Sequence, residues 1–196
     1  KNVLVVHARD NTKDPMIPSG KQSMVTFSKG CYYTRSTGIW QTVWLESVPE
    51  TYVKSLRIDT TADTAIITAE GVTDGTVTVT TPDGDLSFPL ADGKATVTIP
   101  SPRLWSPEDP YLYELSFKDG EEIIFLYIGV RKVEIKNRVV YINGKKVKVK
   151  GVNRHDTSAT TGYTVTVDDM IADLRQMKRF NINCIRTSHY PNDPLF

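Results

Sequence analysis

The sequence contains little cysteine, no long apolar run and almost no excess of either charge. Its two cysteines, Cys31 and Cys184, lie far apart and outside CxxC spacing. Neither a disulfide framework nor a cysteine-based zinc site is therefore indicated, and we expect two free thiols.

The missing apolar run and the balanced charge narrow the class of partner. No stretch approaches the roughly 18 consecutive apolar residues of a membrane-spanning helix. The first residues, KNVLVVHARD, lack the apolar core and cleavage site of a signal peptide. With 24 Lys and Arg against 23 Asp and Glu, the formal net charge is +1, so no overall field attracts nucleic acid or an acidic membrane. We expect neither as a partner, and a small or neutral molecule instead.

The first two thirds of the chain, approximately, alternate apolar and polar residues, with turn signals at short intervals. This pattern is typical of an all-β sandwich. Asn2–Ala8 is predicted to be a strand. In Thr76–Thr80 the valines should face one side and the threonines the other, and the Asp-Gly pairs at 83–84 and 92–93 supply turns. We therefore place one sandwich at about 48–131.

The pattern changes near Lys132. Val133–Gly151 is predicted to be a hairpin that turns at Asn143-Gly144. A helix is then expected at about Val167–Phe180, with Thr166 as its cap. One face of this helix carries an apolar stripe, formed by Val167, Met170, Ile171, Leu174 and Met177. We expect the stripe to pack against the sheet.

Two short strands flank this predicted helix. One lies near Val149–Val152 and the other at Ile182–Ile185. A strand, a loop, a helix and a strand within some thirty residues have the size of one βαβ unit, whose strands are parallel. The fold class expected from the residues is thus mainly β, followed by an α/β segment.

Polar side chains follow each of the two predicted parallel strands. Asn153-Arg154-His155-Asp156 follows the first, and a segment containing Arg186 and His189 follows the second. In a parallel α/β barrel the loops at these strand ends carry the chemistry. A forked guanidinium beside two imidazoles is suited to binding hydroxyl or carboxylate oxygens. His155, Arg186 and His189 are therefore candidate binding residues.

Simpler roles for these residues stay open. Arg186 can be a structural arginine paired with a carboxylate inside the barrel, and either histidine can be structural. A zinc site made of His155, Asp156 and His189 is less favoured, because neither HxH nor HExxH spacing is present. The three tryptophans, Trp40, Trp44 and Trp105, are expected in a core or an interface rather than as sugar-stacking platforms.

Four stretches of the sequence are distinctive: GVNRHDTSATTGY (Gly151–Tyr163), Met170–Phe196, TGIWQTVWLE (Thr37–Glu46) and LWSPEDPYLYEL (Leu104–Leu115). The most specific pattern among them is Asn-x-x-Arg-Thr-Ser-His-Tyr-Pro at Asn183–Pro191. Together they resemble glycoside hydrolase family 2, whose best-known members are β-galactosidases and β-glucuronidases. The form of TGIWQTVWLE is closer to the β-galactosidase branch.

The resemblance implies three domains. Residues 1–47 would be the C-terminal part of a sugar-binding jelly-roll domain, 48–131 an immunoglobulin-like β-sandwich, and 132–196 the first βαβ portion of a (β/α)₈ barrel. The family's two catalytic glutamates lie further along the barrel. The resemblance therefore implies a fragment that contains no catalytic residue and is inactive by itself.

The resemblance further implies that His155, Arg186 and His189 border the sugar pocket of a retaining exo-β-glycosidase acting on terminal β-galactosides. Many members carry an acidic residue or a histidine where this chain has Thr157 and Ser158, which leaves the sugar preference open. Alternatives are a β-glucuronidase or another family 2 glycosidase, a non-catalytic carbohydrate-contacting sandwich module, and a metal-dependent barrel hydrolase.

The cofactors and partners implied by the resemblance are few. A β-linked sugar is the expected substrate of the full enzyme. No cofactor is expected in this chain, although the full barrel leaves room for a divalent cation. Whether the protein forms a homo-oligomer, and whether it acts in the cytoplasm or the periplasm of a bacterium, is left open.

Overall fold

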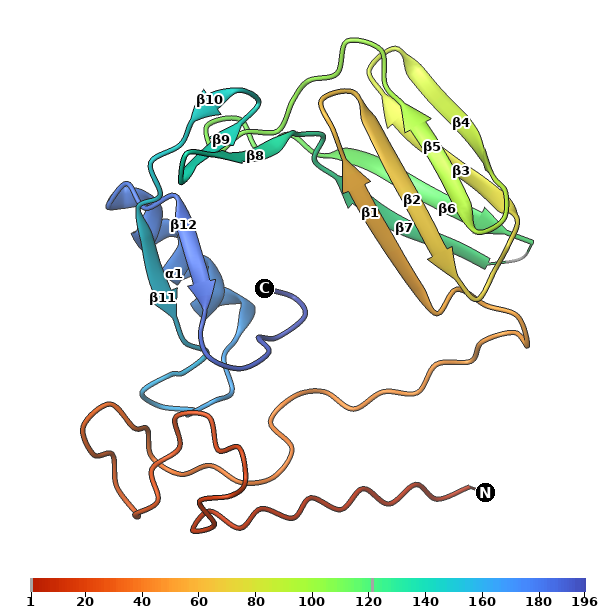
Figure 1. Ribbon diagram of the computed structural model, residues 1–196. Helices are drawn as coiled ribbons and strands as arrows, with labels where there is room; N and C mark the ends of the chain where they lie inside the picture. The colour runs from red at the N-terminus through yellow and green to blue at the C-terminus, as the bar shows by residue number, and fades with distance from the viewer. Residues whose placement is uncertain (1, 121) are drawn as a thin grey trace. The chain divides into compact units, whose positions relative to one another are not determined.

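A computed structural model describes residues 2–120 and 122–196 (Figure 1). The chain forms two compact units. One, the sandwich unit, is Glu46–Lys148. The other, the α/β unit, combines the described residues up to Leu45 with Val149–Phe196. We describe each unit by itself.

The sandwich unit contains two antiparallel sheets, with strand orders β1-β2-β5 and β4-β3-β6-β7. This architecture confirms the predicted β-sandwich. The strands are β1 (Ser55–Thr60), β2 (Thr64–Glu70), β3 (Gly75–Thr81), β4 (Gly84–Leu90), β5 (Lys94–Thr98), β6 (Tyr113–Asp119) and β7 (Glu122–Ile128).

The core of the sandwich unit follows from the alternation in its strands. In β3, Val77 and Val79 are fully buried while Thr76 and Thr80 are exposed, as the sequence predicts. Apolar side chains from both sheets form one buried cluster, and Phe117 on β6 is the largest fully buried side chain in it. Burial of this apolar area is the main stabilising contribution to such a sandwich.

Of the two predicted Asp-Gly turns, the pair at 92–93 is confirmed and the pair at 83–84 is shifted by one residue. Between β4 and β5, Asp92 and Gly93 are the two turn residues inside the bridge from Ala91 to Lys94, and both have positive φ, 51° and 72°. Between β3 and β4, however, the two turn residues are Pro82 and Asp83, and Gly84 already belongs to β4. Proline occupies the turn because its fixed φ suits the first central position.

The segment after the sandwich is a meander of three strands. They are β8 (Val133–Lys136), β9 (Val139–Ile142) and β10 (Lys145–Lys146), paired antiparallel in the order β10-β9-β8. The predicted turn at Asn143-Gly144 is confirmed, with φ of 51° and 74°. The prediction of a single hairpin was wrong, because a second turn lies at Asn137-Arg138, also with positive φ.

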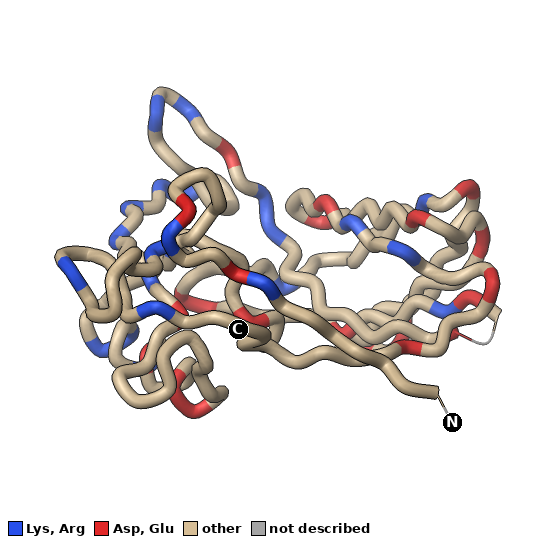
Figure 2. Tube along the Cα trace, turned by 90° about the horizontal axis from the view of Figure 1, so that it is seen from below, with Lys and Arg blue, Asp and Glu red and all other residues tan. Residues whose placement is uncertain are grey.

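Lysine and arginine are concentrated along this meander, whereas charges of both signs are spread over the strands of the sandwich (Figure 2). Both outer strands carry lysines, Lys136 on β8 and Lys145 and Lys146 on β10. Charged side chains on an open strand edge hinder pairing with another chain. The lysines on β8 and β10 should therefore disfavour pairing of these outer strands with another chain.

The α/β unit contains the predicted βαβ arrangement. Strand β11 (Gly151–Arg154) and strand β12 (Cys184–Thr187) pair in parallel and are connected through helix α1 (Val167–Arg179). The parallel pairing and the helix are confirmed, although each strand begins two residues later than expected. Helix α1 starts with a capping box, in which Thr166 accepts from the Asp169 amide and the Asp169 carboxylate accepts from the Thr166 amide.

The apolar stripe of α1 is only partly covered. Met170 is buried, whereas Val167, Ile171 and Leu174 are exposed. We expected the stripe to pack against the sheet. Two short strands offer too little surface to cover more than one turn of the helix, so only Met170 is enclosed.

The N-terminal segment of the α/β unit lacks regular strands among the residues that the structure describes. Its backbone pairing is limited to the isolated bridges Gln22–Tyr33 and Lys29–Tyr32. The prediction of a strand at Asn2–Ala8 was wrong: this segment is exposed and unpaired. Its alternation is that of a strand, but a strand is stable only beside a neighbour that pairs with its backbone groups.

The domain boundaries at 47/48 and 131/132, and the jelly-roll assignment of residues 1–47, stay predictions.

Cys31 and Cys184 are free and exposed thiols. Within the described residues, no helix is both long and apolar enough to cross a bilayer.

Candidate functional site

The pairing of β11 with β12 brings the three candidate residues to one edge of the sheet. Asn153 lies opposite Arg186, and Arg154 lies opposite Thr187. The strands are parallel, so both end at the same edge, and His155 and His189 follow them there. The two imidazole rings lie 5.3 Å apart, centroid to centroid, in an edge-to-face arrangement. The expected convergence is confirmed, whereas a binding role stays a prediction.

Arg186 orients the ring of His189. The guanidinium Nη1 lies 3.0 Å from Nδ1 of His189. Because a guanidinium has donors only, the imidazole nitrogen must accept this hydrogen bond. The neutral ring therefore carries its proton on Nε2. None of the described carboxylates forms an ion pair with Arg186, so the alternative of a carboxylate-paired arginine finds no support at this position.

Both histidines are held in the neutral form. Burial lowers the pKa of His155, and the nearby His189, Lys21 and Arg186 lower it further. The pKa of His189 is also lowered, by desolvation first and then by the positive charges of Arg186 and Lys21. The Nδ1 atom of His155 is buried without a hydrogen-bond partner among the described residues. At neutral pH the pair can therefore offer neutral donors and acceptors to a ligand.

A buried arginine that we did not predict fixes the loops around the histidines. Arg154, the last residue of β11, is 2% exposed. Its Nη1 donates to Asp156, and its Nε donates to Asp173 on α1 over 3.0 Å. Its guanidinium also lies 4.2 Å from the ring centroid of Phe196. The carboxylate-paired arginine that we considered for Arg186 is thus found at Arg154.

Asp156 connects this arginine to the second loop. Its Oδ2 accepts from the Asp193 amide over 3.1 Å, while its Oδ1 accepts from Arg154. The loop after β11 and the loop after β12 are therefore tied to the same carboxylate. The only sequence signal for this link was the placement of Arg154 and Asp156 on either side of His155.

The N-terminal segment contributes an aromatic side chain to the site. The ring of Tyr33 lies edge to face with His155 at 5.6 Å and with Tyr163 at 5.5 Å, and Tyr163 meets Tyr190 at 5.6 Å. Burial raises the pKa of Tyr163 to about 12 and also raises the pKa values of Tyr33 and Tyr190. The three phenols are neutral at physiological pH and can donate hydrogen bonds.

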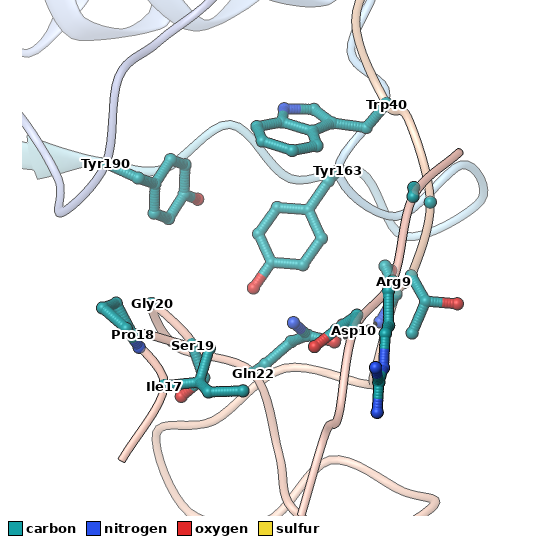
Figure 3. Close-up of a pocket in the computed structure, with 14 residues that line it drawn as sticks. Arg9, Asp10, Ile17, Pro18, Ser19, Gly20, Gln22, Trp40, Tyr163 and Tyr190 are labelled. Carbon is teal, nitrogen blue, oxygen red and sulfur yellow. Dashed lines mark hydrogen bonds between the residues drawn. The ribbon is translucent and has the colours of Figure 1, made fainter. Parts of the chain in front are cut away.

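A pocket of about 400 Å³ opens beside these tyrosines (Figure 3). Trp40, Tyr163 and Tyr190 form its aromatic lining, and residues 8–10, 17–20 and 36–38 complete it together with Gln22. Trp40 is 53% exposed. Of the two expected places for Trp40, a core is therefore excluded, and an interface stays a prediction. A smaller pocket of about 160 Å³ is lined by Asp156 and Asp193, among others.

The three residues considered for zinc do not form a ligand set. Both carboxylate oxygens of Asp156 accept hydrogen bonds from protein groups, and Nδ1 of His189 accepts from Arg186. In the part of the chain that the structure describes, no three His, Cys, Asp or Glu side chains form a group that could hold a metal ion.

Two family descriptions match the chain. "Glycosyl hydrolases family 2" matches residues 50–131, which contain the sandwich, and "Glycosyl hydrolases family 2, TIM barrel domain" matches residues 133–196, which contain the three candidate residues. The chain belongs to glycosyl hydrolase family 2.

Curated relatives and solved structures agree with this family. A β-galactosidase of Halalkalibacterium halodurans is 32% identical over 188 residues, covering 82% of this chain and 18% of the relative. A β-galactosidase of Oenococcus oeni is 32% identical over 219 residues, covering 90% and 21%. The structure of a β-glucuronidase from Faecalibacterium prausnitzii aligns with a TM-score of 0.65 at 30% identity, covering 74% of this chain and 25% of that one. The chain spans about a fifth of the length of these curated relatives.

Proposed function

We propose that this family 2 chain forms part of a retaining exo-β-glycosidase that hydrolyses terminal β-galactosides. The observation that carries the proposal is the convergence of His155, Arg186 and His189 at the carboxyl ends of two parallel strands, inside the segment that matches the family's barrel domain. Active sites of such barrels lie at this face. The β-galactosidase names of the curated relatives support the choice of sugar.

In this proposal the chain supplies substrate-binding groups and no catalytic residue. A retaining glycosidase uses two carboxylates about 5–5.5 Å apart, one as nucleophile and one as acid and base. We assign both to other parts of the enzyme, and we assign no cofactor to this chain. His189 donates from Nε2 to a sugar hydroxyl, while Arg186 holds the ring in that orientation. His155 provides a second neutral contact beside it.

The β-glucuronidase alternative is favoured by one specific observation. Arg186 is a cation that forms no ion pair with the described carboxylates, and a guanidinium binds a carboxylate such as that of a uronic acid in a bidentate manner. Structures named as β-glucuronidases also align with this chain. Relative rates on nitrophenyl β-galactoside and nitrophenyl β-glucuronide, measured on the longer enzyme, decide between the two sugars.

The role of His189 is tested by substitution in the longer enzyme. We expect His189→Ala to lower kcat/KM on the order of 10²-fold, because a positioned donor is lost. The melting temperature should hardly change, because the ring is exposed at the loop surface. His7→Ala, at an exposed position outside the site, is the matched control and should leave both values unchanged.

Two results would contradict the proposal. One is a His189→Ala enzyme whose melting temperature collapses while its activity per folded molecule is preserved, which would make the histidine structural. The other is β-galactosidase turnover by the 196-residue chain itself that disappears on His189→Ala, since the chain is expected to be inactive alone. A longer protein without any glycosidase activity would favour a non-catalytic carbohydrate-contacting module.

A further inference from the structure

We infer that strand β7 is a self-association surface, through which two copies of this chain pair edge to edge into a symmetric dimer. Strand β7 lies at one edge of the sheet β4-β3-β6-β7, where it pairs with β6 on one side (Figure 1). None of the described residues pairs with the backbone on its other side. The inference concerns the sandwich unit, so it goes beyond the proposed function, which rests on residues of the α/β unit.

Strand β7 carries an apolar stripe that the described residues leave uncovered. Ile123, Phe125 and Tyr127 lie on the outer face of the sheet and are 50%, 78% and 65% exposed. The alternate residues Ile124 and Leu126 face the core but are only half-buried. Both faces of this edge strand are thus apolar and incompletely covered. A contiguous exposed apolar patch of this kind marks an interaction site.

The other sheet edges of the sandwich unit carry residues that hinder pairing with another chain. Charged side chains and proline on an edge strand have this effect. They are Arg57 and Asp59 on β1, Lys94 on β5, and Asp85 and Pro89 on β4. Strand β7, by contrast, has six apolar residues in succession after Glu122, without proline or glycine. Of the four edges that the described sandwich strands form, the edge at β7 is therefore the one that is open to a partner.

The sequence of β7 is complementary to itself when two copies run antiparallel about Phe125. Phe125 then faces Phe125 of the second copy, and Ile123 faces Tyr127 on the outer side. On the inner side, Ile124 faces Leu126. Cross-strand pairs of aromatic and branched aliphatic residues stabilise a sheet. A slip by two residues would leave Ile123 or Tyr127 without an apolar partner, so the stripe specifies this register.

The arrangement closes after two copies, and the charges beside the stripe are complementary. A twofold axis uses the open edge of each copy, so no open edge remains for a third. Lys118 on β6 lies opposite Ile123, and Glu114 lies opposite Tyr127. The row that contains Lys118 in one copy therefore continues into the row that contains Glu114 in the other, with opposite charges at its two ends.

The available area fits a weak dimer. An aromatic side chain buries roughly 150–250 Å², so Phe125 and Tyr127 of both copies supply roughly 600–1,000 Å² at most. Specific interfaces bury about 1,200 Å² or more, and the aliphatic residues of β7 bring the total close to this lower limit. We therefore expect a dissociation constant on the order of 10–100 µM, with monomers in dilute solution.

The inference is tested by analytical ultracentrifugation of the 196-residue chain over a concentration range that spans this constant. We expect a reversible equilibrium between monomer and dimer. Phe125→Lys should weaken the dimer more than about tenfold, because two like charges would face each other where two aromatic rings had paired. The matched control is Thr80→Lys, which adds the same charge at an exposed position on β3, separated from β7 by β6. This variant should keep the affinity of the parent chain.

Cysteine cross-linking tests the register of the pairing. In a chain with Cys31→Ser and Cys184→Ser, Phe125→Cys places two thiols directly opposite each other. The Cα atoms are then about 4.5–5.5 Å apart, which a disulfide can span, so oxidation should give a covalent dimer. Tyr127→Cys by itself should not cross-link, because the two thiols are displaced by about 14 Å along the strands. A mixture of Ile123→Cys and Tyr127→Cys chains should again cross-link, as a heterodimer.

Three outcomes would overturn the inference. They are a chain that stays monomeric over the whole concentration range, an association that Phe125→Lys leaves as strong as in the parent chain, and cross-linking of Tyr127→Cys that is as efficient as that of Phe125→Cys. Circular dichroism checks the fold of each variant. If Phe125→Lys does not fold, the cross-linking of the cysteine variants decides.

Discussion

The sandwich unit and the α/β unit are stabilised by opposite kinds of buried group. Every buried apolar residue of the described chain except Met170 lies in the sandwich unit. The four buried polar or charged residues, Ser23, Arg154, Asp156 and Ser188, all lie in the α/β unit. Apolar burial stabilises without regard to direction, whereas a buried polar network requires each partner in place. The unit that carries the candidate site is thus the one whose structure depends on individual hydrogen bonds.

The largest expected effect is in the apolar core. Phe117→Ala should lower the free energy of unfolding of the sandwich by about 4 kcal/mol, because it leaves a cavity among fully buried residues. Hydrogen exchange measured by mass spectrometry would report the loss of protection in residues 46–148. Phe125→Ala, exposed on β7, is the matched control and should have little effect. Equal loss of protection in both units would show that they unfold together and would break the comparison.

The polar network should respond almost as strongly to the loss of one partner. Arg154→Met leaves Asp156 buried without its cation, which costs about 3 kcal/mol. The same change at Arg57, whose ion pair with Asp59 is exposed, should hardly alter stability. Denaturant unfolding of the two variants gives the difference. If Arg154→Met were as stable as the parent chain, the network would not be what holds the two loops.

A smaller effect is expected at the start of α1. Thr166→Ala removes the side chain that accepts from the Asp169 amide, at a cost of about 1 kcal/mol. Hydrogen exchange should become faster in the α/β unit alone. Thr157→Ala, exposed in the preceding loop and outside the cap, should exchange at the parent rate.

The smallest effect concerns mildly acidic pH, which should act on the α/β unit through its two histidines. The sandwich unit contains no histidine, whereas His155 and His189 both have a lowered pKa in the folded chain. The ordinary pKa of a histidine is 6.5. When the pH falls below this value, the histidines of the unfolded chain take up protons before those of the folded chain do. The folded state therefore loses stability as the pH falls from 6.5 toward the lowered pKa values of the folded chain. Protection of the α/β unit should therefore decline between neutral and mildly acidic pH. The double variant His155→Phe with His189→Phe should lose this decline, and an equal decline in the sandwich would contradict the explanation.

The sequence predicted best those features that depend on neighbours along the chain. The strands of the sandwich and the helix at Val167–Arg179 followed from periodicity and capping, which are local. The convergence of His155 with His189 followed from one topological rule about parallel strands. By contrast, the turn at Asn137-Arg138 was missed because arginine rarely adopts positive φ and gives no turn signal.

Features that depend on distant partners could not be predicted in the same way. The role of Arg154 requires knowledge that Asp173 on α1 reaches back to the end of β11. The pocket requires Trp40 and Tyr190 to line the same space, although they lie far apart in the sequence. The strand expected at Asn2–Ala8 failed for a related reason, since alternation describes a strand but does not supply the neighbour with which it pairs.

The two exposed thiols allow a distance within the α/β unit to be measured with fluorescent dyes. Cys31 lies in the N-terminal segment, Cys184 begins β12, and the sandwich unit has no cysteine. A pair of maleimide dyes would therefore label the α/β unit alone, without any cysteine having to be introduced or removed. Energy transfer between the dyes follows the separation of the N-terminal segment from the parallel strands, molecule by molecule. Any change in this separation can thus be measured in the unaltered sequence.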